Sequence, residues 1–192
     1  GNLGYTHHSL QDYGLMRLFP NMMITSPGDD MEVRACMRYI VKNPQPSYLR
    51  LAKTKNKILH KKIPSVKPGK WLPISIKHPK SKKIFLTTGN IAGLAKGLLT
   101  RAKYNKFSLY SLPIWGMKFK NIQLNQLKKW DEVLVLEDHL EDGGFGSWIK
   151  ESTNNRKIKT KIISKSIDKK IISKVGSEQY LLDKHYLKFF GK

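Results

Sequence analysis

The chain has 192 residues, 40% of them hydrophobic, which is enough to bury a sizeable core in one or two domains. Its 36 basic residues outnumber its 14 acidic ones and give a net charge of +22, which raises the question of a polyanionic partner. Only six of the basic residues are Arg, whose planar fork recognises bases and phosphates best, so we expect no specific nucleic-acid binding; weak, salt-sensitive binding stays open.

The single cysteine, Cys36, excludes an intrachain disulfide and a Cys-based zinc site. Because it falls at an apolar position of a predicted helix, a small buried side chain is favoured over a reactive thiol. No apolar run approaches the ~18 residues of a membrane span, and no charged-then-apolar leader is present, which predicts no membrane segment and no signal peptide. We therefore expect a cytoplasmic protein.

Helix and strand signals alternate over residues 10–51. Residues 22–25 predict a short strand, and residues 47–51 predict another. Between them, Asp29 precedes a helix whose apolar residues recur at helical spacing, namely Val33, Cys36, Met37 and Ile40. The order strand, helix, strand is that of a parallel α/β sheet.

Residues 53–83 have a different character, because they contain many Lys residues, four prolines and neither Asp nor Glu. Such a composition leaves little chance of a helix. We predict a basic, Pro-containing linker over residues 54–82, with some strand content at residues 71–76. An anion-binding arm is the alternative to a solvated linker.

From residue 83 the α/β pattern resumes. Strands are predicted at residues 84–88, 107–112, 132–136 and 159–163, and helices at residues 91–99, at residues 121–130, around Trp148 and from residue 178. This alternation predicts a doubly wound, mostly parallel sheet of at least four strands.

Four motifs, in order along the chain, resemble those of transketolase-like, thiamine diphosphate-dependent enzymes. They are residues 4–22 with Thr6-His7-His8, then residues 87–90 (TTGN), 135–139 (VLEDH) and 143–147 (GGFGS). In that family the first lies in the pyrimidine-binding domain and the others in the C-terminal domain. The resemblance implies an α/β protein in which residues 1–53 are the C-terminal part of a pyrimidine-binding domain and residues 83–192 are a transketolase C-terminal-like domain.

The resemblance also implies a substrate-binding site. The family's Thr-His histidine contacts substrate oxygens, a role that falls to His7, with Thr6 orienting the turn and His8 beside it. A metal-binding histidine pair is disfavoured because adjacent side chains point apart, and an idle surface pair is the other alternative. A basic residue after the next strand holds the sugar phosphate in the family. The candidates are Arg50 and Lys53, with plain strand-edge charges as the alternative.

Two departures from the family pattern limit what the chain is expected to do alone. Leu3 stands where other members have an Asp that hydrogen-bonds a substrate hydroxyl. The family's catalytic glutamate, and the aromatic residue that stacks on the cofactor, have no counterpart in this sequence. Thiamine diphosphate and Mg²⁺ are therefore expected in the parent enzyme and not on this chain by itself.

Together these features predict the C-terminal segment or subunit of a transketolase-like transferase that catalyses ketol transfer on a sugar phosphate. The expected partners are an upstream thiamine-binding portion or N-terminal subunit, and further copies of the parent enzyme in a homo-oligomer. A 1-deoxy-D-xylulose-5-phosphate synthase-like activity, favoured by Thr6-His7-His8, and a noncatalytic assembly subunit are the alternatives.

Two further features have both a structural and a chemical interpretation. Gly143 to Gly146 opens a helix as phosphate loops do, but no Gly-Lys-Ser/Thr follows and acidic residues crowd the turn, which favours a structural role. His139 stands beside acidic residues and would suit an acid–base group, whereas the family resemblance favours packing or subunit contact.

Overall fold

The computed structural model describes residues 9–52, 58–77, 81–153 and 156–177, together with Tyr180, Leu181 and Lys184. Its strands are β1 (Met23–Thr25), β2 (Ser47–Leu49), β3 (Leu72–Ser75), β4 (Lys83–Thr87), β5 (Ser108–Ser111), β6 (Ile114–Trp115), β7 (Glu132–Leu140) and β8 (Lys161–Ile167). Its helices are α1 (Asp12–Arg17), α2 (Asp30–Lys42), α3 (Ile91–Leu98), α4 (Gln123–Leu127) and α5 (Phe145–Glu151). Three short 3-10 turns complete the described elements, η2 (Ala102–Tyr104), η3 (Met117–Phe119) and η4 (Lys169–Ser173).

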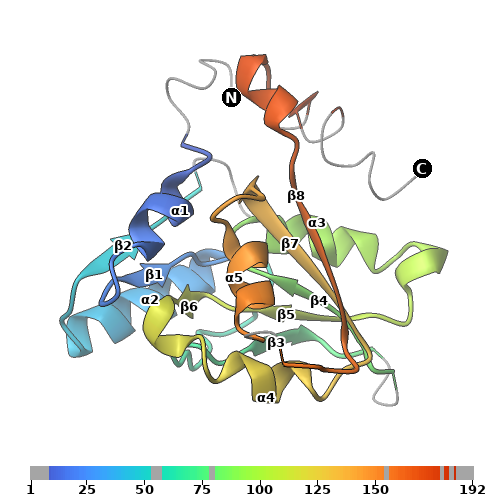
Figure 1. The fold of residues 1–192 in the computed structure, drawn as a ribbon, viewed down its shortest axis with the longest axis horizontal. Helices are drawn as coiled ribbons and strands as arrows, with labels where there is room; N and C mark the ends of the chain where they lie inside the picture. The colour runs from blue at the N-terminus through green and yellow to red at the C-terminus, as the bar shows by residue number, and fades with distance from the viewer. Residues whose placement is uncertain are drawn as a thin grey trace.

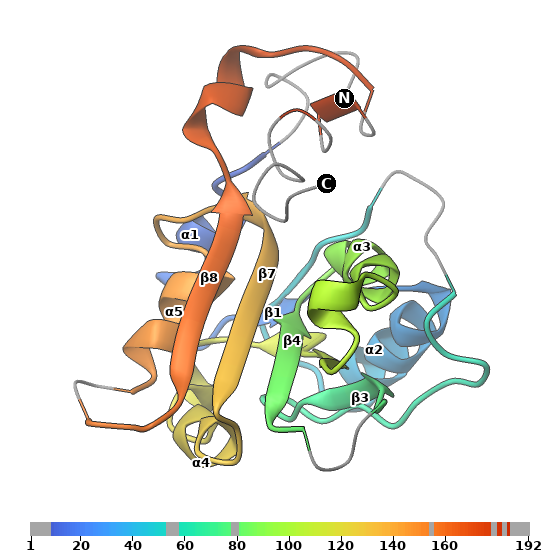
Figure 2. The same ribbon diagram turned by 90° about the vertical axis from the view of Figure 1, so that its right-hand side faces the viewer.

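The larger sheet has the strand order β3-β5-β4-β7-β8, in which the last four strands are parallel and β3 is an antiparallel edge. Successive residues of a strand point to opposite faces, so Ile84 and Val133 enter one core while Phe85 and Leu134 enter another. Helix α3 covers one face and α5 the other (Figures 1 and 2). The doubly wound, mostly parallel sheet predicted from the sequence is therefore confirmed.

The smaller sheet has the order β2-β1-β6, with β2 parallel and β6 antiparallel to β1. Helix α2 connects β1 to β2 and begins as predicted after Asp29, whose carboxylate accepts the Glu32 N–H at 2.8 Å as an N-cap. Cys36 is fully buried on this helix, and burial raises the pKa of its thiol. The prediction of a buried, unreactive position is confirmed.

The two sheets share residues across the boundaries expected from the sequence. Strand β6 comes from the second half of the chain but pairs with β1, and β3, predicted within the linker, pairs with β5. The Asp29 carboxylate also accepts the backbone N–H groups of Leu59 and His60, at 2.8 and 2.9 Å. These contacts join segments from either side of the expected domain limits. The limits at residues 53 and 83 stay predictions.

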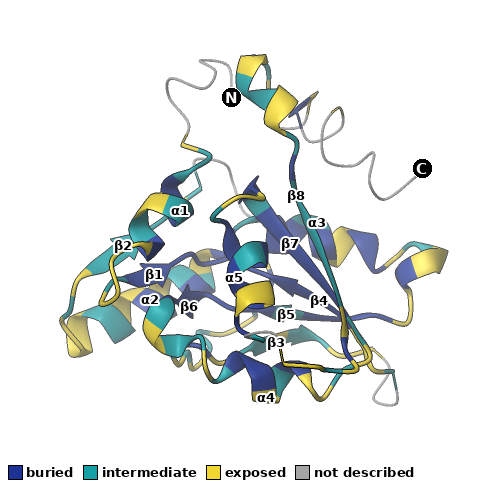
Figure 3. Ribbon diagram, viewed as in Figure 1, coloured by how far each residue is buried: buried dark blue, intermediate teal, exposed yellow. Residues whose placement is uncertain are grey.

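The polar and apolar faces of the elements are separated as expected for a packed α/β protein. Figure 3 shows the strands of the sheet interiors as buried and the outer faces of α2 and α4 as exposed. The largest fully buried side chains include Trp115, Trp148 and Tyr13, which pack in one core. Among the described residues, no helix combines the length and apolarity that crossing a membrane requires.

Candidate functional site

Only one of the five predicted substrate-binding residues lies within the described part of the chain. Thr6, His7, His8 and Lys53 lie outside it, and Arg50 is described. Arg50 follows β2 directly, and its backbone N–H donates to the Thr25 carbonyl at 2.8 Å, which continues the sheet pairing by one residue. Its side chain thus starts from the carboxyl end of a parallel strand, the edge at which α/β sheets place ligands.

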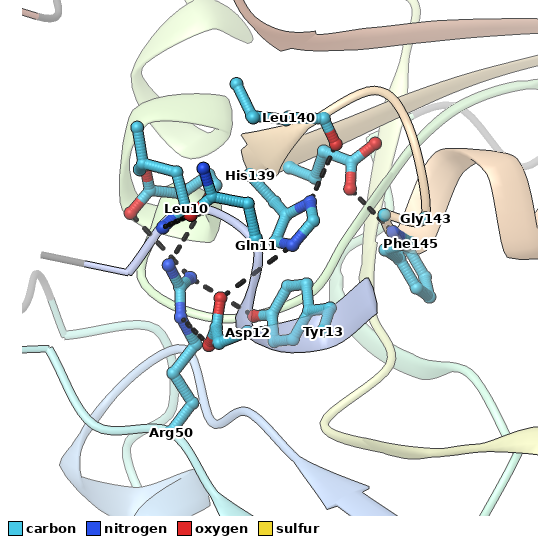
Figure 4. Close-up of polar contacts among 12 residues, drawn as sticks. Leu10, Gln11, Asp12, Tyr13, Arg50, His139, Leu140, Gly143 and Phe145 are labelled. Carbon is cyan, nitrogen blue, oxygen red and sulfur yellow. Dashed lines mark hydrogen bonds and ion pairs between the residues drawn. The ribbon is translucent and has the colours of Figure 1, made fainter. Parts of the chain in front are cut away.

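The guanidinium of Arg50 is half enclosed by oxygens of the same chain (Figure 4). Its Nε lies 2.9 Å from Oδ2 of Asp12, one terminal nitrogen donates to the Asp138 carbonyl at 2.9 Å, and the other donates to the Tyr13 hydroxyl at 3.3 Å. The Asp138 carboxylate lies 3.8 Å away. Burial opposes the charge of Arg50, but the neighbouring Tyr13, Asp138 and Asp12 together raise its pKa. Arg50 is therefore a charged cross-link between α1, β2 and β7.

Asp12 is the buried carboxylate at the centre of this cluster. Its Oδ2 accepts the Tyr48 hydroxyl at 2.9 Å as well as the contact with Arg50. Burial raises the pKa of Tyr48 to about 12, and the charge of Asp12 acts in the same direction. Asp12 stands at the first position of α1, where a negative charge is favourable. Its position in the sequence gives no sign that Arg50 lies beside it, because the two residues are 38 positions apart with α2 between them.

Tyr13 extends the cluster to the turn after β4. Its hydroxyl lies 2.6 Å from Ser26 Oγ, and the Ser26 carbonyl accepts the Gly89 N–H at 2.9 Å. Gly89 has a φ of 75°, and a Cβ at this position would lie 2.7 Å from Ser26 Oγ. A side chain there would therefore be strained and would clash, which explains the Thr-Gly turn recognised in the sequence.

His139 packs on the other side of Tyr13. The two rings stack with centroids 5.0 Å apart, and His139 is fully buried. Its Nδ1 lies 2.7 Å from the Leu140 carbonyl oxygen, and its Nε2 lies 3.8 Å from Oδ1 of Asp12. Burial lowers the pKa of His139. His139, for which the sequence allows either an acid–base or a packing role, is thus a buried residue in contact with α1.

The glycine turn before α5 is filled by a carboxylate of its own chain. Glu137 is fully buried, and its two oxygens accept the N–H groups of Phe145 and Gly146, at 2.6 and 3.0 Å. Burial raises the pKa of Glu137 to about 8, against these two donors, which favour the carboxylate. The backbone donors that would hold a phosphate are therefore already used. This arrangement supports the structural interpretation of the Gly143 to Gly146 turn.

The same turn packs closely against α1. Gly143 has a φ of 72°, and a Cβ built on it would lie 3.0 Å from the Cα of Gly14. Arg17, at the last position of α1, donates to the Gly144 carbonyl at 3.2 Å and to Ser147 Oγ at 2.9 Å, and it also pairs with Glu151. Helix α1 therefore contacts the motifs at residues 135–139 and 143–147 directly, and reaches the turn at residues 87–90 through Ser26.

A second buried carboxylate, Glu32, lies in the first turn of α2, which follows β1. One of its oxygens accepts the Gly28 N–H at 2.7 Å and the Ser111 hydroxyl at 3.0 Å, and the other lies 3.0 Å from Nε2 of His60. Glu32 is 0% exposed. Since each oxygen has a partner, this group fixes the segment at residues 58–60 onto α2 and shows no position left for a ligand.

Comparison with known proteins finds that this chain is similar to transketolases and related synthases. Residues 1–57 match the family model "Transketolase, pyrimidine binding domain". The chain is 42% identical over 53 residues to one subunit of the apulose-4-phosphate transketolase of Phocaeicola vulgatus, a match covering 28% of this chain and 17% of that protein. It is 26% identical over 153 residues to the subunit of the same name from Actinobacillus succinogenes, covering 79% of this chain and 48% of that one.

A relative of a different name matches over a similar length. The chain is 26% identical over 163 residues to 1-deoxy-D-xylulose-5-phosphate synthase of Aliarcobacter butzleri, a match that covers 82% of this chain and 26% of that protein. The chain thus spans between 17% and 48% of the length of these three relatives.

Solved structures share the fold. A structure titled "Split gene transketolase, inactive beta4 tetramer" superposes with a TM-score of 0.78 at 19% identity, covering 95% of this chain and 59% of that one. The transketolase of Campylobacter jejuni superposes with a TM-score of 0.69 at 17% identity, covering 95% of this chain and 27% of that one. The family model and the relatives support a member of the transketolase-like family of thiamine diphosphate-dependent enzymes, and the solved structures show that the fold is shared.

Proposed function

We propose that this chain supplies the C-terminal part of a transketolase-like transferase, as a segment or as a separate subunit, and that the parent enzyme catalyses ketol transfer on a sugar phosphate. The observation that carries the proposal is the convergence of the motif segments on α1. The turn after β4 reaches α1 through Ser26, β7 through His139, and the glycine turn through Gly143. The Thr6-His7-His8 segment directly precedes this helix in the sequence.

The names of the relatives support a two-part enzyme. Two of them are named as one subunit of a transketolase, and one structural neighbour is the product of a split gene. We propose that the partner is an upstream, thiamine-binding portion or N-terminal subunit, and that the complete enzyme is a homo-oligomer of the combined unit.

The described residues by themselves do not fit thiamine diphosphate with Mg²⁺. They include no group of three or more His, Cys, Asp and Glu side chains placed to hold a metal ion. The amides of Phe145 and Gly146, the donors of the glycine turn, are bonded to Glu137. We therefore propose that the cofactor and its Mg²⁺ are held by the partner portion.

The proposed substrate contacts divide between the two basic candidates. Each guanidinium nitrogen of Arg50 already contacts an oxygen of this chain, so a phosphate would have to compete with Asp12 and Asp138. We propose that Arg50 holds the site together and that Lys53 makes the phosphate contact, while Thr6, His7 and His8 contact the sugar.

The test is reconstitution with the upstream portion of the enzyme. The combined enzyme should transfer a two-carbon ketol unit between sugar phosphates. His7→Ala should lower kcat/KM roughly ten- to a hundredfold, the cost of one lost polar contact of ~1–3 kcal/mol. His8→Ala should do less, and matched melting temperatures control for folding. Wild-type kcat/KM in His7→Ala on the true substrate would contradict the assignment.

A 1-deoxy-D-xylulose-5-phosphate synthase-like reaction is the second candidate, because synthases of that name match this chain over most of its length. The donor substrate separates the two. Turnover with a ketose phosphate donor supports ketol transfer, and turnover with a 2-oxo acid donor and release of carbon dioxide supports the second candidate. Stable assembly with a partner that already carries a complete active site of its own would favour a noncatalytic role for this chain.

A further inference from the structure

Helix α1 is attached to the second half of the chain along its whole length. The Leu140 N–H donates to the Leu10 carbonyl at 3.2 Å, just before the helix. Asp12 faces His139 at its start, and Arg17 donates to the Gly144 carbonyl at its end. The position of α1, and of the chain that enters it, therefore depends on the end of β7 and the turn that follows.

The contact between His139 and Asp12 has no hydrogen between its two facing atoms. Nδ1 of His139 lies 2.7 Å from the Leu140 carbonyl oxygen, which only accepts, so in the neutral ring Nδ1 carries the hydrogen. The lone pair of Nε2 then faces Oδ1 of Asp12, 3.8 Å away, which as a carboxylate oxygen also only accepts. Both atoms are buried, and neither has a hydrogen-bond partner among the described residues.

The surrounding charges pull in opposite directions on this proton. Burial lowers the pKa of His139 and the charge of Arg50 acts in the same direction, while the backbone groups of Leu140 and Gln11 and the charge of Asp12 act to raise it. The other titratable groups on this side are Tyr13 of α1, whose ring stacks on His139, and Asp138 of the same strand, which pairs with Arg50. The ring is thus neutral near neutral pH, and a proton can enter on acidification.

We propose that Asp12 and His139 are positioning residues for the start of α1, and that a proton gained between them closes the contact and shifts residues 9–11, which lead into the helix. The protonated ring donates from Nδ1 to Leu140 and from Nε2 to Asp12, which satisfies both unpaired atoms. The consequence for catalysis rests on the proposed function, because it assumes that Thr6–His8 contacts the substrate. The coupling itself does not depend on that function.

Substitutions distinguish an effect of protonation of His139 from a general effect on folding. Asp12→Asn offers an amide N–H to the neutral Nε2, while its carbonyl can still accept from Arg50 and Tyr48. His139→Gln removes the titrating ring and keeps a polar amide. His60→Gln is the matched control, because His60 is a partly buried histidine next to a carboxylate, Glu32, but lies on the segment bound to α2.

The experiment is an NMR titration of the isotope-labelled chain from about pH 8 to about pH 5, following the His139 imidazole and the backbone amides of residues 9–11. We expect these amides to shift with the same midpoint as His139, below its ordinary pKa of 6.5. The shared step should vanish in Asp12→Asn and His139→Gln and persist in His60→Gln. Amides that ignore the His139 midpoint in the wild-type chain, which requires no variant to fold, would overturn the proposal, as would a step retained in His139→Gln.

The reconstituted enzyme adds an independent measurement. If the proposed function also holds, His139→Gln should flatten the dependence of KM on pH between about pH 5 and about pH 8, with a smaller change in kcat. A shared NMR step without any turnover would leave the coupling intact and refute the proposed function. Turnover whose KM keeps its wild-type pH dependence in His139→Gln would refute the positioning role.

Discussion

Two histidine–carboxylate pairs, one with a partly buried histidine (His60) and one with a fully buried histidine (His139), differ in how completely they are bonded. His60 and Glu32 are 3.0 Å apart, and the remaining oxygen of Glu32 accepts hydrogen bonds from Gly28 and Ser111. His139 and Asp12 are 3.8 Å apart, and the two facing atoms have no hydrogen-bond partner among the described residues. Both pairs consist of a histidine and a carboxylate, but only in the His60–Glu32 pair are the facing atoms within hydrogen-bonding distance.

The difference follows from what each pair joins. His60–Glu32 attaches an extended segment to α2, so the backbone can adjust until every group is bonded. Asp12–His139 joins a helix to a strand that are already held by Gly14, Gly143 and Arg50, so neither side moves freely. A fully bonded pair stabilises the fold, whereas an incompletely bonded pair is one that a proton can change.

The largest effect should come from removing the carboxylate of the complete pair. Glu32→Ala leaves the Gly28 N–H, the Ser111 hydroxyl and His60 without their acceptor. We expect the free energy of unfolding to fall by about 3–5 kcal/mol, measured by urea denaturation. The exposed, paired residue Glu141 provides the control, because Glu141→Ala should cost less than about 0.5 kcal/mol. Similar losses in both variants would show that the Glu32 contacts contribute little.

Removing the positive charge of Arg50, which lies next to the Asp12–His139 pair, should have the next largest effect on stability. Arg50→Met leaves Asp12 and Asp138 without their shared partner, and we expect a loss of about 3 kcal/mol in the free energy of unfolding. Arg34→Met on the exposed side of α2 should change it by less than about 0.5 kcal/mol. A stable Arg50→Met variant would mean that Arg50 is available for a ligand.

Glu137 is a third buried carboxyl group, and it is hydrogen-bonded to backbone N–H groups and not to a histidine. Its pKa in the folded chain is raised from 4.5 to about 8, so the folded state holds the proton more tightly than the unfolded state. This contribution to stability is complete below about pH 4.5 and is lost as the pH rises through about 8.

Glu137→Gln should remove that pH dependence, which we expect to amount to about 3–4 kcal/mol between pH 5 and pH 8. Urea denaturation at the two pH values measures it, with Glu141→Gln as the exposed control. Parallel pH profiles for the wild-type chain and Glu137→Gln would contradict the assignment of the slope to Glu137.

The smallest effect separates the two histidines. Because the pKa of His139 is lowered in the folded chain, its contribution to stability is complete above its ordinary value of 6.5 and is lost as the pH falls below it. His139→Gln should remove this loss of stability at acidic pH, and His60→Gln should leave it in place. Melting temperatures above and below this window provide the measurement, and a slope unchanged in His139→Gln would count against the account.

The sequence is most informative where a signal is local. Asp29 before an apolar helical stripe predicts α2, and continuous apolar runs predict β4 and the start of β7. The predicted end of β7 is four residues too early, because Glu137, Asp138 and His139 are polar. They continue the strand since Leu140 still pairs with Ile167 on β8.

The site is less accessible to sequence analysis because it is assembled from distant segments. No pattern in the sequence predicts α1, and β6 is only two residues long and is defined by its pairing with β1. Arg50 is identified through a family resemblance, but no spacing in the sequence indicates that it meets Asp12 and Asp138. The charges of such a cluster are visible in a sequence, while their mutual distances depend on the tertiary fold.

Ketol-transfer turnover, measured for this chain alone and after mixing with the upstream portion of the enzyme, tests the central claim most directly. The account predicts no turnover above the blank for the chain alone with thiamine diphosphate and Mg²⁺, and saturable turnover once the two portions are combined. Turnover by the 192-residue chain without a partner would contradict it. So would a stable complex of the two portions that, supplied with cofactor and substrates, transfers no two-carbon unit.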